Sequence, residues 1–152
     1  MSIGVVVMAY GTPRAPEDVE AYYTHIRRDR PPEPHQLAEL VARYDAIGGI
    51  SPLAQRTEAQ RAAIADHLGD GFTVVLGQKH AAPFVEDAVA SLVEQGAGTI
   101  VGLVLAPHFS RFSVGQYTTG RALRSARTPT IATGRSTRGT SSRPTSTSSR
   151  TP

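Results

Sequence analysis

The chain has 152 residues, of which 39% are hydrophobic and 19% are charged, a size and composition typical of one globular domain. It contains no cysteine, which excludes disulfides, zinc ribbons, thiol catalysis and cysteine-ligated iron–sulfur clusters within this chain. No apolar run is long enough for a membrane span, and the N-terminus lacks the basic segment of an export signal, so we expect a cytoplasmic protein.

The net charge of +3 is unevenly distributed along the chain. Residues 1–123 hold ten basic and thirteen acidic side chains, whereas residues 124–152 hold six arginines and no acid. The second segment is rich in Ser, Thr and Pro and has Ile131 as its only large apolar residue, so we expect it to be disordered. Three interpretations of this tail remain: a flexible segment, an Arg/Ser segment that touches nucleic acid, or codons translated out of frame. The second is the weakest, because no aromatic residues are interleaved for base stacking, and we expect no nucleic-acid partner.

Strand patterns and helix patterns alternate along residues 1–123. The run Ile3–Ala9 is continuously apolar and rich in valine, which is typical of a strand buried on both faces of a parallel sheet. The elements predicted in chain order are a strand at Ile3–Ala9, helices at Pro16–Arg28, from Pro34 to Gly48-Gly49, and from Ser51-Pro52 to Gly69, a strand at Phe72–Leu76, a helix at Pro83–Gln95, a strand at Thr99–Ala106, and a helix from Ser113.

The last strand–helix–strand succession predicts a parallel pair with a right-handed crossover, so the fold class is α/β, with a parallel sheet and flanking helices. Three strands are few for such a sheet, and we expect the body to be incomplete.

Polar and aromatic groups follow each predicted strand, and ligands of open α/β sheets bind at that edge. The residues expected there are Tyr10, Lys79, His80 and His108, with Arg27 and Arg28 from the end of the first long helix. A cleft of this composition suits a flat or aromatic ligand that bears carboxylates, because guanidinium groups bind carboxylates in a forked geometry.

Each of these residues also has a purely structural interpretation. Tyr10 fits a turn aromatic with its hydroxyl in water, the two histidines fit donors to backbone carbonyls, and the two arginines fit the negative end of the helix dipole. Three other histidines, His25, His35 and His67, lie on predicted helices at unrelated spacings, and we expect them at the surface. No spacing of histidines and carboxylates predicts a metal site.

Four runs of sequence resemble the N-terminal half of bacterial ferrochelatases: VVMAYGTPRAPEDVEAYYTHIRRDRPP, LVARYDAIGGISPLAQRTEAQ, GQKHAAPFVEDAVASL and VLAPHFSRFSVGQYTTGRA. The likeness spans roughly residues 3–123 and is nearest the Gram-positive and actinobacterial enzymes that act on coproporphyrin III. It implies the N-terminal lobe of a two-lobed α/β lyase that inserts Fe2+ into a porphyrin during haem biosynthesis. Iron is then a substrate, and no cofactor is required.

The resemblance also implies roles for particular residues. It assigns porphyrin binding to Tyr10, Arg27, Arg43, Tyr44, Ser51 and Tyr117. Tyr10 is further implied to be an axial ligand of the product iron. The residues by themselves point to Tyr10 and Arg27, but they assign Arg43, Tyr44 and Ser51 only to helix structure and do not single out Tyr117.

The sequence departs from the family's pattern in its second half. The family's catalytic histidine, in a Ser-Ala-His-Ser-type motif, and its catalytic glutamate have no counterpart here, so no catalytic residue is assigned. We expect a truncated or frameshifted ferrochelatase that is inactive by itself, and that aggregates through an unpaired sheet edge where the complete protein is a monomer. The alternatives are a stand-alone porphyrin- or haem-binding module and a nucleic-acid-associated protein that uses the tail.

Overall fold

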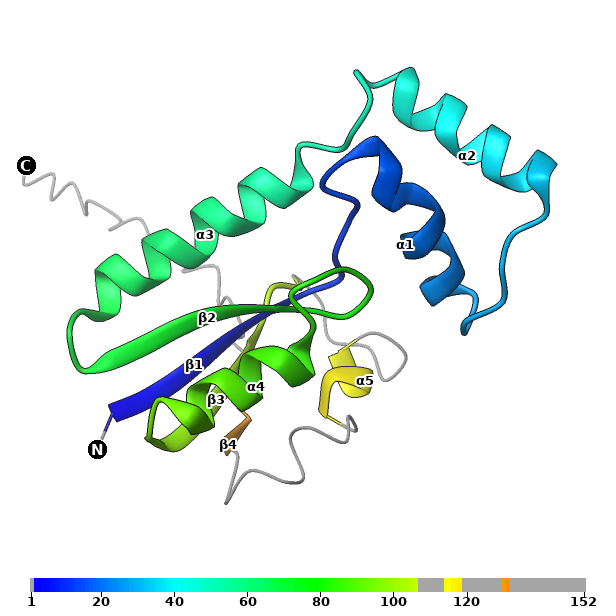
Figure 1. Ribbon diagram of the computed structural model, residues 1–152. Helices are drawn as coiled ribbons and strands as arrows, with labels where there is room; N and C mark the ends of the chain where they lie inside the picture. Colours follow the sequence, from blue (N-terminus) through cyan, green and yellow to red (C-terminus); the bar gives the residue numbers. More distant parts are fainter. Residues whose placement is uncertain (1, 107–113, 119–129, 132–152) are drawn as a thin grey trace, which may run out of the picture.

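The computed structural model describes residues 2–106, 114–118 and 130–131 (Figure 1). Its elements are β1 (Ser2–Ala9), the 3-10 turn η1 (Pro16–Asp18), α1 (Val19–Ile26), α2 (Pro34–Asp45), α3 (Leu53–Leu68), β2 (Phe72–Gln78), α4 (Val85–Glu94), β3 (Ala97–Val104), α5 (Val114–Thr118) and β4 (Thr130–Ile131). The order of strands and helices predicted up to residue 106 is confirmed. The expected first helix is divided into η1 and α1, and it ends before Arg28 and Asp29, which both have a φ of 60°.

The sheet is parallel and its strand order is β2-β1-β3-β4, so the predicted α/β class is confirmed. β1 lies between β2 and β3 and is the central one of the three long strands. It pairs with β2 from Ile3↔Phe72 to Ala9↔Gln78 and with β3 as far as Met8↔Val104. All three long strands therefore end at one edge, where the chain next turns toward helices.

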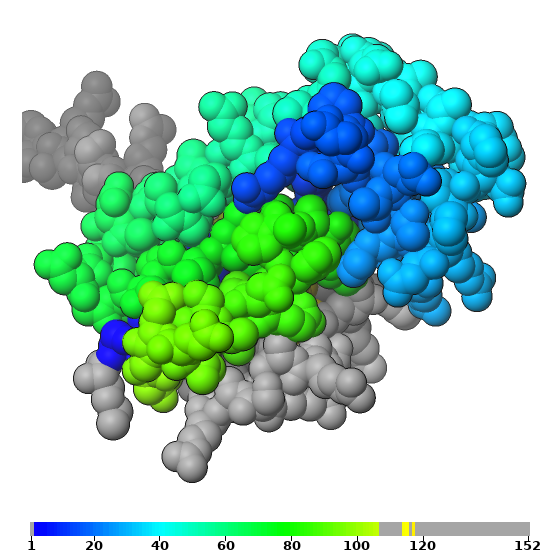
Figure 2. All heavy atoms as spheres, in the orientation of Figure 1, coloured from blue at the N-terminus to red at the C-terminus, as the bar shows by residue number. Residues whose placement is uncertain are grey.

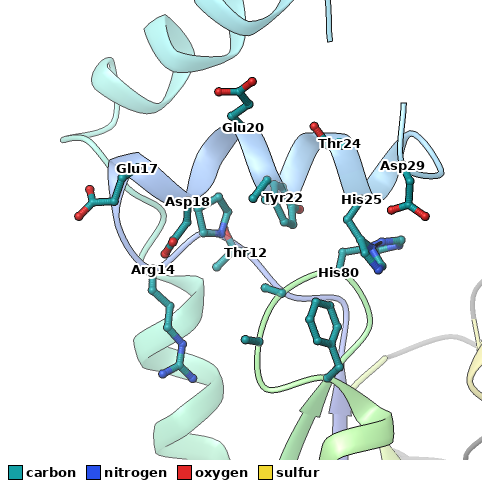
Figure 3. A pocket seen from close by; sticks show the side chains of 15 residues that line it. Thr12, Arg14, Glu17, Asp18, Glu20, Tyr22, Thr24, His25, Asp29 and His80 are labelled. Carbon is teal, nitrogen blue, oxygen red and sulfur yellow. Dashed lines mark hydrogen bonds between the residues drawn. The ribbon is translucent and has the colours of Figure 1, made fainter. Parts of the chain in front are cut away.

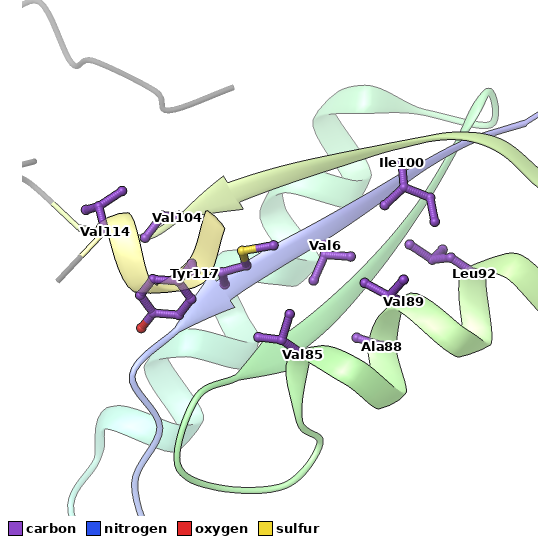
Figure 4. Packing of buried hydrophobic residues seen from close by; sticks show 10 residues of the cluster. Val6, Val85, Ala88, Val89, Leu92, Ile100, Val104, Val114 and Tyr117 are labelled. Atoms are coloured by element: carbon purple, nitrogen blue, oxygen red, sulfur yellow. The ribbon is translucent and has the colours of Figure 1, made fainter. Parts of the chain in front are cut away.

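Both faces of β1 are buried, which explains the uninterrupted apolar run in the sequence. On one face Val6 and Met8 pack against α4 and α5 (Figure 4). On the other face Val5 and Val7 share a cluster with residues of β2 and α3. α1 and α2 pack on each other, and Figure 2 shows them beside one another at one end of the molecule. Figure 1 shows that they lie beyond the carboxyl ends of the strands.

Residues 130–131 form one short strand that the sequence did not predict. Thr130 and Ile131 pair in parallel with Val101 and Gly102 of β3. Composition indicates that a segment has little to bury, but it does not reveal that a neighbouring strand offers free backbone donors and acceptors. The three long strands of the parallel sheet are those predicted, and β4 adds a fourth strand of two residues. The remaining residues of the tail lie outside the described residues.

Among the residues that the structure describes, no helix combines the length and the apolar character needed to cross a bilayer.

Candidate functional site

Tyr10 lies at the carboxyl end of the central strand. The backbone N–H of Lys79 donates to the Ala9 carbonyl oxygen at 2.9 Å, and the N–H of His80 donates to the Tyr10 carbonyl oxygen at 3.0 Å. The chain after β2 is thus bound alongside the turn after β1. The phenol of Tyr10 projects from this turn and is 49% exposed.

Two of the other predicted residues lie against the ring of Tyr10. The ring centroid of His80 is 4.6 Å from that of Tyr10, with the planes inclined at 54°, and the Nζ of Lys79 is 5.7 Å from the Tyr10 centroid. Both contacts are within the usual ranges for aromatic and cation–π pairs. Burial lowers the pKa of Lys79 below its ordinary value. The structure therefore brings together three of the residues predicted for the edge, while His108 lies outside the described residues.

His25 is part of this cluster, so the expectation that it is a surface residue is wrong. Its Nδ1 lies 3.0 Å from the Nδ1 of His80, and its ring stacks on Phe84 with centroids 5.2 Å apart. Helical spacing reveals only neighbours on one helix, whereas His80 is 55 residues away in the sequence. The other two helical histidines, His35 and His67, are exposed as expected.

The side chain of His80 bonds an imidazole rather than the backbone carbonyl that the structural interpretation suggested. Burial lowers the pKa of His80 to about 4, and Lys79 and His25 add to the effect. His80 is therefore a neutral imidazole at pH 7, and it is able to accept or donate one hydrogen bond at each ring nitrogen.

Four tyrosines from different segments are joined by pairwise electrostatic interactions, which link Tyr22 to Tyr44 and Tyr10, and Tyr117 to Tyr10. Burial raises the pKa of Tyr22 far above the ordinary range, and Tyr44 and Tyr10 raise it further. Burial also raises the pKa of Tyr117 to about 12, with a smaller contribution from Tyr10. Three of the four, Tyr10, Tyr44 and Tyr117, were predicted. Tyr22 was not predicted as a site residue, although the run YYTHIRR contains it.

Tyr117 is a core residue as well as a predicted site residue. Only 8% of it is exposed, and it belongs to the cluster formed by Met8, Val104 and Val114 (Figure 4). Its hydroxyl is linked electrostatically to Tyr10, which adds to the effect of burial on its pKa.

The remaining predicted residues are spread over α1, α2 and the start of α3. Arg27 places its guanidinium carbon 5.5 Å from the ring centroid of Tyr23, and its Nε is buried without a hydrogen-bond partner in the described part of the chain. Arg43 is 72% exposed and pairs with Glu39 on its own helix. Ser51 accepts a hydrogen bond from the Leu53 N–H at 3.2 Å, while Pro52 occupies the N-cap position of α3.

A cavity of about 720 Å³ lies between α1 and the loop after β2 (Figure 3). Tyr22, His25 and His80 line it, and so do four carboxylates against a single arginine: Glu17, Asp18, Glu20, Asp29 and Arg14. None of the six residues predicted to bind porphyrin lines this cavity. This cavity does not unite Tyr10, the histidines and Arg27, and its excess of carboxylates would repel a carboxylate ligand.

The helix geometry explains this division. His25 faces the cavity, and Arg27 follows it by two residues, which corresponds to a rotation of roughly 200° around a helix. Arg27 is consequently directed toward Tyr23 on the other side of α1. The region beside Tyr10 and the cavity under α1 are two adjacent sites that share His80.

A protein-family model described as Ferrochelatase matches residues 2–133. The chain belongs to the ferrochelatase family. The matched region extends beyond Leu123, where the sequence resemblance ends, and it includes β4.

Similar proteins include the coproporphyrin III ferrochelatases of Bacillus pumilus (strain SAFR-032) and Bacillus subtilis (strain 168), each 54% identical over 120 residues. The coproporphyrin III ferrochelatase of Anoxybacillus flavithermus (strain DSM 21510 / WK1) is 53% identical over 125 residues. These alignments cover 76%, 76% and 79% of this chain but only 38%, 39% and 39% of the relatives. The chain thus spans well under half the length of the ferrochelatases that it matches.

Within the described ranges, no group of three or more His, Cys, Asp or Glu side chains is arranged to hold a metal ion. The family resemblance assigns iron contact to Tyr10, whose exposed phenol is compatible with a ligand to a metal at the centre of a macrocycle.

Proposed function

We propose that this chain supplies the porphyrin-binding half of a lyase that inserts Fe2+ into coproporphyrin III in haem biosynthesis. The observation that carries the proposal is the half-exposed ring of Tyr10 at the carboxyl end of the central strand. Ligands of open α/β folds bind at this edge. The relatives that support it are named coproporphyrin III ferrochelatases.

The residues around Tyr10 suit a flat ligand that carries acidic groups. In the proposed complex the macrocycle lies against the phenol of Tyr10, and the phenol oxygen faces the metal centre. The ammonium of Lys79 stands beside that ring. Arg27 forms no ion pair with a carboxylate in the described part of the chain, so its guanidinium is available to a propionate.

The proposal retains Arg43, Tyr44, Ser51 and Tyr117 as porphyrin contacts implied by the family. Arg43 would have to leave Glu39, which is a small loss because an exposed ion pair contributes about 0–1 kcal/mol. Tyr44 and Tyr117 are included because Tyr44 contributes to the raised pKa of Tyr22, and Tyr10 contributes to the raised pKa of Tyr117.

Metallation requires two pyrrole protons to leave while a hydrated ferrous ion loses its water. A base and metal ligands on the opposite face of the macrocycle have to do this, and the histidine and glutamate that perform it in the family have no counterpart in the 152 residues. We therefore propose that this chain by itself binds the porphyrin without metallating it. The proposal treats Fe2+ as substrate, assigns no further cofactor, and places the protein in the cytoplasm.

Titration of the 152-residue chain with coproporphyrin III, followed by absorbance, tests the binding. We expect Arg27→Ala to weaken binding about tenfold, as the loss of a charge-assisted hydrogen bond would. Arg56→Ala, an exposed position on α3, is the matched control. Tyr10→Phe should weaken binding of the iron complex of the porphyrin more than binding of the free porphyrin, because only the complex offers the phenol a metal ion.

Protoporphyrin IX serves as the second ligand in the same titration, because it carries two propionates where coproporphyrin III carries four. Stronger binding of coproporphyrin III supports the proposed substrate. Unchanged affinity in both Tyr10→Phe and Arg27→Ala would refute the assignment of these two residues to the porphyrin site. Iron insertion at the rate of a full-length relative would overturn the proposal that this chain by itself binds the porphyrin without metallating it.

A further inference from the structure

Four aromatic side chains form a continuous row at the carboxyl edge of the sheet. Phe84, just before α4, stacks on His25 of α1 at 5.2 Å and 30°. His25 meets His80 edge-on at 5.2 Å and 72°, and His80 lies against Tyr10 at 4.6 Å. The row connects the cavity under α1, where Figure 3 shows His25 and His80 directed toward each other, to the exposed phenol of Tyr10.

The hydrogen bond between the two histidines fixes the rotation of both rings. Their Nδ1 atoms are 3.0 Å apart. Two such atoms form a hydrogen bond only when one carries the proton and the other presents its lone pair, so one ring donates through Nδ1–H and the other accepts at Nδ1. A low pKa for His80 agrees with a neutral imidazole at residue 80.

The ring of Tyr10 lies against the imidazole of His80. Within the described residues the Tyr10 hydroxyl forms no hydrogen bond, and its ring contacts are those with His80 and Lys79. The backbone N–H of His80 also bonds the Tyr10 carbonyl oxygen, and this bond does not involve the imidazole. A change at residue 25 can therefore release the imidazole of His80 while the backbone beside Tyr10 stays in place.

We propose that His25 is a positioning residue that orients the phenol of Tyr10 by holding the imidazole of His80. The inference rests on the proposed porphyrin site, because the orientation of the Tyr10 phenol matters when that phenol contacts a bound porphyrin. An axial oxygen has to lie close to the normal through the centre of the macrocycle. Site geometry is usually kept by such supporting side chains, and small displacements reduce binding and reactivity strongly.

Two substitutions separate the hydrogen bond from the packing. His25→Phe keeps a ring between Phe84 and His80 but removes Nδ1. His25→Asn loses the ring but places an amide oxygen or nitrogen near the position of Nδ1, so it retains a partner for His80. His35→Phe, on the exposed face of α2, controls for replacing a helical histidine by phenylalanine.

The first measurement is the NMR spectrum of the ligand-free chain with labelled histidine and tyrosine rings. We expect His25→Phe to shift the ring nitrogens of His80 and the ring protons of Tyr10. His25→Asn should leave the Tyr10 ring close to its wild-type position, and His35→Phe should change neither ring. If His25→Phe leaves both rings unchanged, the inference is wrong, whether or not the chain binds porphyrin.

The second measurement is a double-mutant cycle on the affinity for iron coproporphyrin III. We expect His25→Phe to weaken binding about tenfold in the wild-type background and to have no further effect beside Tyr10→Ala, because interacting residues are not additive. An equal loss in both backgrounds would show that His25 acts independently of Tyr10 and would overturn the inference. A wild-type chain that binds no porphyrin would refute the proposed function, and the NMR result would still decide the link between the rings.

Discussion

The hydroxyl of Tyr22 donates a hydrogen bond to the carbonyl oxygen of Gly11 at 3.3 Å. This contact joins α1 to the turn that carries Tyr10, although the two residues are eleven positions apart in the sequence. Burial, followed by the neighbouring phenols of Tyr44 and Tyr10, raises the pKa of Tyr22, so its hydroxyl stays protonated and remains a donor throughout the ordinary pH range. The helix and the turn are thus held together at the site.

Tyr22→Phe tests this contact. The substitution leaves the Gly11 carbonyl oxygen without its donor, and we expect the free energy of unfolding to fall by about 1 kcal/mol. Tyr23→Phe is the matched control, because its hydroxyl forms no hydrogen bond within the described ranges, and it should change stability by less than about 0.5 kcal/mol. Urea unfolding gives both values, and equal losses would contradict the role of the hydrogen bond.

Gly11 is required by its backbone and by its surroundings. It has a φ of +94°, and a Cβ there would lie 3.0 Å from the Ala81 backbone nitrogen. Gly48 has a φ of +97° with nothing within 4 Å of a Cβ. Gly48→Ala therefore measures the cost of the positive φ without any steric overlap. We expect Gly48→Ala to lower the free energy of unfolding by about 1 kcal/mol and Gly11→Ala by about 2–4 kcal/mol, because only the second also overpacks. Similar losses at both positions would show that the approach of Ala81 is unimportant.

The neutral state of His80 makes stability depend on pH. Burial lowers its pKa from 6.5 to about 4, so between these values the unfolded chain binds more protons than the folded chain. Stability should therefore decrease as the pH falls from 6.5 to 4. His80→Phe should flatten this slope, whereas His35→Phe, at an exposed position, should leave it unchanged. Thermal unfolding over this pH range measures the slopes, and an identical slope in His80→Phe would contradict the assignment.

Arg61 protects the outer edge of the sheet. Its Nη1 donates to the carbonyl oxygen of Val74 in β2 at 3.3 Å. At the two ends of β2, the backbone N–H groups of Phe72 and Gln78 donate to the carbonyl oxygens of Gly69 and Pro83. We expect Arg61→Ala to increase self-association, because an uncovered strand edge pairs with other chains. Arg56→Ala, on the exposed face of the same helix, is the control. Sedimentation velocity at matched concentrations tests this, and an unchanged distribution in Arg61→Ala would show that the edge is protected by other means.

The local elements could be predicted because their signals are local. The valine-rich run of β1 indicates burial on both faces wherever it is placed, and prolines and glycines mark where helices begin and end. The position of Tyr10 at the carboxyl edge of the sheet could be predicted for a related reason. A residue directly after a buried parallel strand lies at the ligand-binding edge regardless of how the helices pack.

The relations between distant residues could not be predicted. His25 and His80 are separated by 55 positions and meet only after α1 folds across the loop that follows β2. Tyr117 combines a core ring with an electrostatic link to Tyr10 because α5 packs against β1 and β3. β4 forms because β3 offers it backbone partners.

The sequence by itself determined the order of strands and helices, the parallel α/β class and the place of Tyr10, since each depends on composition and spacing within one segment. The tertiary structure alone decided that His25 belongs with Tyr10, that Tyr22 holds the turn, and that Arg27 faces away from the cavity under α1. The physical reason is that hydrogen bonds and ring contacts act over a few ångströms in space. Their partners are therefore fixed by the packing of whole elements rather than by distance along the chain.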